Sequence, residues 1–114
     1  MGKTTKGQRW VFDADVESTS PGEGVERKVL AYSDDAMCVV HRFKKGAIGA
    51  LHCHPHTQIT YVAAGVFEFE IDGEKKTVKT GDAMLKQSDV KHGAICLEEG
   101  VLVDFFMPMR RDFV

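Results

Sequence analysis

Apolar and polar residues alternate with a period of two along most of the chain after residue 24. The clearest case is Val66-Phe-Glu-Phe-Glu-Ile71, in which the apolar residues in phase with the isoleucine fall on one face and both glutamates on the other. Successive side chains of a strand point to opposite faces, so this pattern predicts a strand with one buried face. Asp72-Gly73 follows, a pair that suits a type I′ turn, and residues 74–79 are predicted to return as the second strand of a hairpin.

Similar short segments, separated by turns that contain glycine, follow one another along the chain. The further predicted strands are residues 25–33, 37–43, 83–86, 92–97 and 101–107, with a turn at 98–100, and residues 9–13 are a weaker candidate. No window shows a sustained helical period. The pattern therefore predicts an all-β domain, a sandwich or small barrel, over residues 25–114, preceded by an N-terminal arm over residues 1–24 that carries the weaker strand.

Length and composition limit the class of protein. A chain of 114 residues with a hydrophobic fraction of 43% is expected to form one domain with one core. The net charge of −2, with both signs interspersed, gives no reason to expect a nucleic-acid or membrane-surface partner. The longest nearly apolar run, residues 59–69, is too short to span a bilayer. The N-terminus lacks the apolar segment of a secretory signal, and three cysteines without framework spacing suit reduced thiols, so we expect a cytoplasmic protein.

The candidate chemistry lies in a histidine-rich segment, residues 46–65. His52, His54 and His56 occupy alternate positions, and Gln58 continues the alternation. In an extended strand these side chains would share a face. One segment would then direct several neutral nitrogen donors and an amide oxygen at a single point, as a first-row metal ion requires.

The spacing within this segment fits a known motif. Gly46, His52, His54 and Gly65 match the first cupin motif, G-x5-H-x-H-x3-E-x6-G, and Gln58 stands where the family usually has Glu. The second cupin motif, G-x5-P-x-G-x2-H-x3-N, begins after an interval of 15 residues.

That second motif is only partly kept. Gly81 and His92 match it, whereas Gln87, Asp89 and Cys96 depart from it. Together, in this order and at this separation, the two motifs make the chain resemble a single-domain cupin from about residue 25 to residue 108. The resemblance implies a jelly-roll β-barrel.

The expected ligand set is His52, His54 and Gln58, from one hairpin, and His92, from a strand across the barrel. Three imidazoles and one oxygen donor suit one divalent transition metal and leave room for water or substrate; Ni, Zn, Fe, Mn and Co all remain possible. An amide oxygen cancels none of the metal's charge, so Gln58 should make the site favour an anionic ligand. It also departs from the pattern of two histidines and one carboxylate found in oxygenases. His56 is expected on the rim of the site rather than among the ligands.

Two longer stretches of sequence narrow the resemblance to one family of cupins. Residues 52–69 read H-x-H-P-H-x-Q-x-x-Y-V-x-x-G-x-F-E-F and residues 104–113 read D-x-F-x-P-x-R-x-D-F, which is similar to the KdgF family of pectin-degradation cupins. The resemblance implies conversion of unsaturated 4-deoxyuronate monomers, released by pectate or alginate lyases, into open-chain keto forms. Asp104, Phe106 and Arg110 match tail residues that the family uses near the substrate.

The residues of the C-terminal tail can also be interpreted without the family resemblance. Leu102, Asp104 and Phe106 are in phase on a strong predicted strand, so Asp104 is expected inside the barrel. There it is a candidate general acid or base, or a hydrogen-bonding partner of a ligand imidazole. Arg110 is either a bidentate clamp for a substrate carboxylate or a surface arginine, and Phe106 a core residue or a pocket wall. His41, a single histidine among apolar residues, is expected to be a satisfied interior residue.

These observations favour a metal-dependent enzyme that acts on a small anionic sugar. Two alternatives remain open at this stage: a cupin oxygenase or lyase acting on another small acid, and a non-catalytic module that binds a sugar or a metal. Exposed sheet edges make a homodimer plausible. The sequence assigns no role to Arg27.

Overall fold

In the computed structural model, which describes residues 4–114, eight strands and two short 3₁₀ helices account for most of the chain. The strands are β1 (Thr19–Gly22), β2 (Val25–Tyr32), β3 (Met37–Phe43), β4 (Ile48–His52), β5 (Thr57–Ile71), β6 (Glu74–Lys79), β7 (Ala83–Lys86) and β8 (His92–Met107). The 3₁₀ helices are η1 (Asp13–Asp15) and η2 (Arg111–Phe113). No helix in the described part of the chain is long and apolar enough to cross a membrane.

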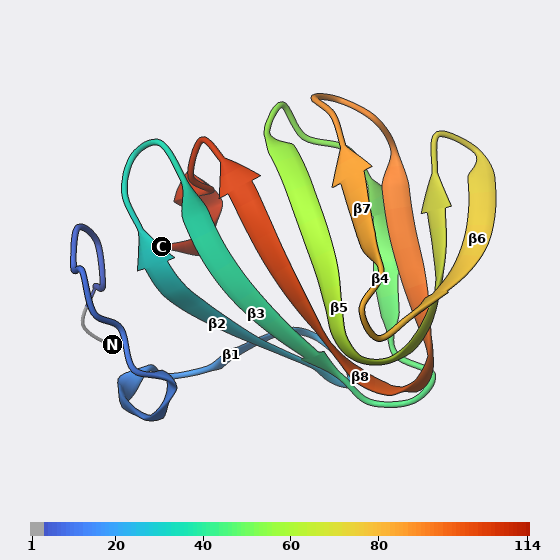
Figure 1. Cartoon of the computed structure of the whole chain (residues 1–114), viewed down its shortest axis with the longest axis horizontal. Coiled ribbons are helices and arrows are strands. Elements are labelled where there is room, and N and C mark those ends of the chain that lie inside the picture. The colour runs from blue at the N-terminus through green and yellow to red at the C-terminus, as the bar shows by residue number, and fades with distance from the viewer. Residues whose placement is uncertain (1–3) are drawn as a thin grey trace.

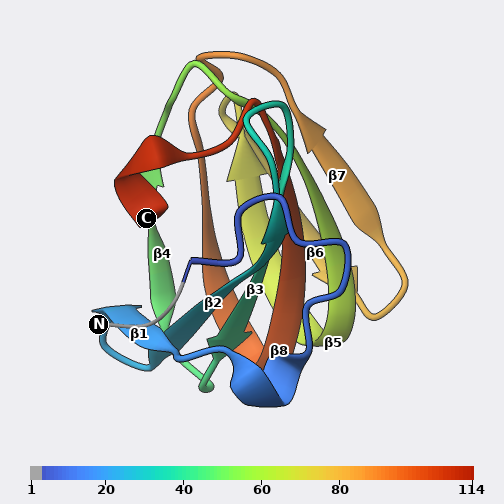
Figure 2. The same cartoon turned by 90° about the vertical axis from the view of Figure 1, so that its left-hand side faces the viewer.

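The strands form an antiparallel barrel with two faces, as expected for a jelly roll. The long strands β5 and β8 pair with each other along most of their length, and each bends through the lower end of the barrel in Figure 1 to take part in both faces. On one face the order is β1-β2-β3-β8-β5-β7, and on the other it is β4-β8-β5-β6. Figure 2 shows the N-terminal segment lying across the outside of β2 and β3. The opposite end of the barrel is formed by the β4–β5 and β7–β8 loops (Figure 1).

Two glycines allow the long strands to bend. The register between β5 and β8 shifts repeatedly between Val62 and Phe67. Gly65 has a φ of 87°, and a Cβ added there would lie 2.5 Å from Cα of Gly100 on β8. Only glycine fits both the backbone conformation and the close approach of the two strands. The glycine of the first motif therefore shapes the barrel rather than the metal site.

Most predicted strands are confirmed. The hairpin over β5 and β6 has positive φ at both Asp72 (50°) and Gly73 (81°), as a type I′ turn requires. The predicted turn at residues 98–100 is wrong, because β8 continues through it as one bent strand. The predicted strand at residues 9–13 is also wrong. The short strand of the N-terminal arm is β1, which pairs with β2; residues 1–3 of that arm lie outside the described residues.

Buried side chains form two apolar clusters with a polar layer beside them. The larger cluster fills the bent end of the barrel: Val25, Phe43, Ala47, Val62, Phe67, Phe69, Ala94, Cys96 and Leu102. The smaller comprises Tyr32, Met37, Val39, Phe106 and Met109. The buried polar and charged residues are His54, Gln58, Thr60, Lys86, His92 and Asp104. Burying a polar group costs free energy unless the group is paired, so this polar layer indicates which part of the interior forms the candidate functional site.

Candidate metal centre

Three histidines converge at the open end of the barrel. His52 ends β4, His54 lies in the loop that follows, and His92 begins β8. One ligand nitrogen from each lies within 4.8 Å of the others. His52 and His92 are direct partners in the β4–β8 pairing, and their ring centroids are 4.5 Å apart. Strand pairing and one short loop are therefore enough to assemble the cluster.

The backbone orients all three imidazoles in the same way. In each ring Nδ1 lies against the carbonyl oxygen of a residue two positions away in the sequence, at 2.7 Å for His52, 3.1 Å for His54 and 3.0 Å for His92. A carbonyl only accepts, so Nδ1 carries the hydrogen and Nε2 keeps its lone pair. Nε2 of His92 is buried without a hydrogen-bond partner among the described residues. Burial lowers the pKa of His92 to about 4, so its ring is in the neutral form that binds metals.

His54 and Gln58 together test whether a metal fits. Nδ1 of His54 faces a carbonyl, and its Nε2 faces Oε1 of Gln58 at 3.0 Å. Both partners are acceptors, but a neutral imidazole has one N–H, and burial lowers the pKa of His54 and disfavours the doubly protonated ring. One of the two contacts therefore lacks a proton. A cation beside Nε2 and Oε1 would satisfy both lone pairs, so the residues fit a metal ion.

Gln58 is held in this orientation from behind. Its Nε2 donates to Oδ1 of Asp104 at 2.8 Å and to Oγ1 of Thr60 at 3.2 Å. Since an ionised carboxylate only accepts, the amide nitrogen must face Asp104 and the amide oxygen must face the histidines.

Asp104 is the centre of a buried hydrogen-bond network. Besides the bond from Gln58, Oγ1 of Thr60 donates to its Oδ1 at 2.5 Å, and Nδ1 of His41 donates to its Oδ2 at 2.7 Å. Burial by itself would raise the pKa of Asp104, but these hydrogen bonds and nearby positive charge hold that pKa well below its usual range. Nε2 of His41 accepts in turn from Nε of Arg27 at 3.0 Å. The expectations that Asp104 is interior and that His41 is a satisfied residue are both confirmed.

A cavity of about 440 Å³ opens beside this network. Its lining includes His52, Gln58, His92, Asp104 and Phe106, together with Arg27, Arg110 and Phe113. Its volume lies within the usual range for small-molecule sites. Three of the four candidate metal ligands thus share one cavity with the candidate substrate-binding residues.

Two arginines stack on one aromatic ring of the cavity wall. Cζ of Arg27 lies 3.7 Å from the ring centroid of Phe113, and Cζ of Arg110 lies 4.4 Å from it. Arg110 also donates from Nε and Nη2 to the carboxylate of Asp112, at 3.0 and 2.8 Å. Burial, followed by the charge of Arg110, lowers the pKa of Arg27. Two guanidinium groups so close together favour an anionic ligand.

Comparisons with known proteins agree with this geometry. The chain matches the family model described as Cupin domain over residues 39–106. It is 48% identical over 109 residues to the Pectin degradation protein KdgF of Dickeya dadantii (strain 3937), which covers 94% of this chain and 99% of the relative. The chain is a cupin of the KdgF family.

Solved structures show the same likeness. A cupin from Shewanella frigidimarina NCIMB 400, described as RmlC-like, superposes on this cupin with a TM-score of 0.93 and 36% identity, covering 97% of this chain and 100% of that one. KdgF from a Halomonas species superposes with a TM-score of 0.88 and 36% identity, covering 92% and 97%.

Motif spacing identified residues of this cupin that do meet, but the prediction of how they meet is wrong. His52, His54 and Gln58 do not share one strand, because β4 ends at His52 and β5 begins only at Thr57, and they do not share one hairpin, because β4 pairs with β8 and not with β5. Nor does His92 lie across the barrel, since it pairs directly with His52. His56 lies outside the three-histidine cluster and contributes its carbonyl oxygen to His54.

Sequence reasoning missed Lys86 and left Arg27 without a role. Lys86 is buried among the polar residues, and burial lowers its pKa to about 8 although the charge of Asp104 acts to raise it. The sequence did indicate that Lys86 points inward. It lies two residues after Met84 on β7, and Met84 is an apolar residue that packs against the core. Arg27 lies next to His41 in the β2–β3 pairing, a relation that only the register reveals.

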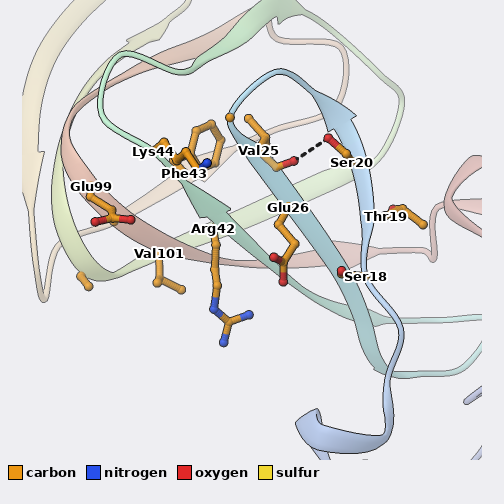
Figure 3. Close-up of a pocket in the computed structure, with 13 residues that line it drawn as sticks. Ser18, Thr19, Ser20, Val25, Glu26, Arg42, Phe43, Lys44, Glu99 and Val101 are labelled. Carbon is orange, nitrogen blue, oxygen red and sulfur yellow. Dashed lines mark hydrogen bonds between the residues drawn. The ribbon is translucent and has the colours of Figure 1, made fainter.

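A second and larger hollow, of about 670 Å³, lies away from the histidines (Figure 3). It is formed where β1 and the start of β2 meet the end of β3 and the bend of β8, and Oγ of Ser20 donates across it to the carbonyl oxygen of Val25 at 3.1 Å. Its charged residues have both signs, with Glu26 opposite Arg42 in the strand register. It contains none of the candidate catalytic groups, so the smaller cavity is the candidate site.

Proposed function

We propose that this cupin is a metal-dependent enzyme of pectin degradation that converts 4,5-unsaturated uronate monomers, from pectin or alginate, into open-chain keto forms. The single observation that carries the proposal is that a cluster of three histidines, which could hold a metal, borders on one cavity through His52 and His92, and that two stacked arginines line the same cavity. Such a cavity suits a small sugar with a carboxylate at one end. The relative named for pectin degradation supports this choice of substrate.

The residues that would hold the metal are His52, His54 and His92, through Nε2, and Gln58, through Oε1. When bound, a divalent ion supplies Lewis-acid stabilisation of an oxygen anion, and with no carboxylate among its ligands it keeps its formal charge of +2. Gln58 therefore tunes the site toward anionic ligands. Asp104 contributes by fixing the amide of Gln58 in the orientation that the site needs.

The arginines would bind the substrate carboxylate. Nε of Arg27 donates to His41, and no hydrogen bond from its terminal nitrogens is found within residues 4–114, so these nitrogens could bind a ligand, whereas Arg110 already donates to Asp112. A sugar carboxylate would compete with Asp112, whose side chain is 60% exposed and bonds weakly in water. Phe106, buried beside the histidines, would form the wall against which the sugar ring lies.

Asp104 would move the proton. Its lowered pKa makes it an ionised base at neutral pH, and it accepts the proton of the C1 hydroxyl as the C1 aldehyde forms. The bond between C1 and the ring oxygen breaks, and its electron pair passes to the ring oxygen as an enolate. The same proton then passes from Asp104 to C4, and the ring oxygen becomes the C5 ketone. Atoms and charge balance, and no oxidant is consumed.

The test uses unsaturated galacturonate generated by a lyase. Purified protein is stripped with a chelator, reloaded separately with Ni, Zn, Fe(II), Mn or Co, and mixed with the sugar, and loss of the conjugated-ene absorbance is followed. Proton NMR of the product identifies the open-chain ketone. We expect acceleration with at least one metal and none in the stripped protein. If no metal-loaded sample exceeds buffer, the proposed function is refuted, and oxygen uptake by the Fe(II) sample would indicate an oxygenase instead.

We also propose that the enzyme is a cytoplasmic homodimer. Apolar side chains lie exposed on the outer face of the β8-β5-β7 sheet, where Ile59 pairs with both Leu85 and Phe105. Covering this face with a second copy would remove apolar surface from water. The free state of the three cysteines supports a reducing compartment. Light scattering after gel filtration tests the dimer: a monomeric mass for the native protein would exclude it, and Phe105→Glu should convert a dimer to monomers.

A further inference from the structure

A lysine lies inside the barrel, on the strand that closes one side of the cavity. Lys86 ends β7 and is 1% exposed, although lysine is among the residues least often found fully buried. It lines the same cavity as His52 and His92. A positive charge placed there costs free energy, so its retention calls for a partner.

The protein satisfies only part of this ammonium group. Nζ donates to Oγ1 of Thr60 at 2.6 Å and lies 4.7 Å from the ring centroid of Phe69. An ammonium has three N–H donors, and within residues 4–114 no second acceptor for it is found. Thr60 gives its own hydrogen to Asp104, which links the lysine to the carboxylate through one hydroxyl. The remaining N–H groups are available to a ligand in the cavity.

Lys86 and the two arginines approach the histidines from different sides. Arg27 is on β2 and Lys86 on β7, and in the sheet these strands are separated by β3, β8 and β5 (Figure 1). Four strand spacings of about 4.8 Å place their backbones on the order of 19 Å apart, so the side chains reach inward from opposite margins. A sugar whose carboxylate lies at the arginines has its ring oxygen at that end, because both are attached to C5, and it presents its hydroxyl oxygens, that of C1 among them, toward Lys86.

We propose that Lys86 is a further catalytic residue of the reaction proposed above, and that its ammonium donates hydrogen bonds to the C1 oxygen as the proton of the C1 hydroxyl passes to Asp104. This inference rests on the proposed function. Loss of that proton leaves negative charge on the C1 oxygen until the C1 carbonyl forms and the electron pair of the bond between C1 and the ring oxygen passes to the ring oxygen, and a fixed cation in a water-poor cavity stabilises the charge on the C1 oxygen. Because the charge develops only on the way to the transition state, the contribution falls on kcat rather than on KM.

The main experiment compares Lys86→Met with Lys76→Met in the metal-loaded enzyme. Methionine keeps the length of the side chain and fills the barrel without charge, and Lys76 is an exposed lysine of β6 that gives the same change of net charge. We expect Lys86→Met to lower kcat at least about 100-fold with KM changed less than about threefold, and Lys76→Met to behave as wild type. Metal content and melting temperature are measured alongside. A merely structural role in supporting Thr60 would lower those quantities and leave kcat per bound metal unchanged.

A second variant tests the role of Lys86 even if Lys86→Met folds poorly. Lys86→Ala opens a hole that propylammonium fits, and we expect this cation, but not propanol, to restore kcat at least about tenfold. Full activity of Lys86→Met at normal metal content would overturn the role of Lys86 while the proposed function stands, and so would failure of the alanine variant to respond to propylammonium. An inactive wild type would overturn both.

Discussion

Replacing Gln58 with Glu is the sharpest test of how the centre is built. The substitution exchanges an amide N–H₂ for a carboxylate oxygen at the point where Nε2 now lies 2.8 Å from Oδ1 of Asp104. The shape of the side chain is unchanged, so the effects come from charge, from protonation and from the loss of the N–H that Gln58 donates to Thr60. The prediction concerns the metal-free protein, where no cation offsets the new carboxylate.

The introduced glutamate can be either ionised or protonated in the folded protein, and the free-energy cost of each form decides which one is populated. Two ionised carboxylates at this distance repel by about 6 kcal/mol at an effective dielectric constant of about 20. Keeping a proton on the introduced glutamate instead costs about 4 kcal/mol at pH 7, because the ordinary pKa of Glu is about 4.3 and each unit costs about 1.4 kcal/mol. The protonated form is the cheaper one, and its single O–H keeps the hydrogen bond to Asp104, although the bond that Gln58 donates to Thr60 is lost. We therefore expect a loss of about 4 kcal/mol at pH 7 and only about 1 kcal/mol at pH 5.

The sign of the pH dependence follows from linkage. The folded state raises the pKa of the new carboxyl above its unfolded value, so the deficit in stability grows as pH rises above about 4.3. Urea unfolding of wild type and Gln58→Glu, in chelator, at several pH values between 5 and 7.5 measures it. A second change, Asp104→Asn, should recover at least half of the loss, because the asparagine amide can donate to the introduced carboxylate while its oxygen still accepts from His41.

A deficit that is the same at every pH, or a double variant no more stable than Gln58→Glu, would show that Asp104 does not set the identity of residue 58. In the metal-loaded enzyme the same substitution cancels one unit of metal charge. Turnover of an anionic sugar should then fall even though metal stays bound.

Three further predictions concern the bend, the metal and the aromatic ring of the cavity. Gly65→Ala should destabilise the protein by at least about 2 kcal/mol in urea unfolding, whereas Gly22→Ala, where an added Cβ meets nothing within 4 Å, should change it by less than about 0.5 kcal/mol. A bound metal at 100 times its dissociation constant should raise the free energy of unfolding by about 2.7 kcal/mol, and His92→Ala should abolish that gain; a gain that survives would place the metal elsewhere. Phe113→Ala removes the ring under both guanidinium groups and should raise KM about tenfold with little effect on kcat in steady-state assays.

Strand positions were predictable because period-two alternation and turn residues are local signals. Asp72-Gly73 fixes its hairpin by backbone conformation alone, and the structure has both residues at positive φ. The bend of β8 was not predictable in this way. Glu98-Glu-Gly100 carries turn residues, but its glycine serves a close approach to Gly65 on β5, a contact between segments 35 positions apart. Local composition cannot distinguish a glycine that ends a strand from one that lets a strand bend.

The candidate metal ligands were predictable from the spacing of a motif and not from alternation along a strand. A motif indicates that residues meet in space without saying which elements bring them together. In the structure a loop separates His52 from β5, so alternation along one strand is not what aligns the candidate ligands. The residues that support the candidate ligands could not be predicted from the sequence. Arg27, His41 and Asp104 come together only through the pairing of β2 with β3 and of β3 with β8, and Lys86 joins them through Thr60 on β5. Register between distant strands is set by the closed barrel as a whole, and so the network that orients Gln58 is a product of the fold that no single segment encodes.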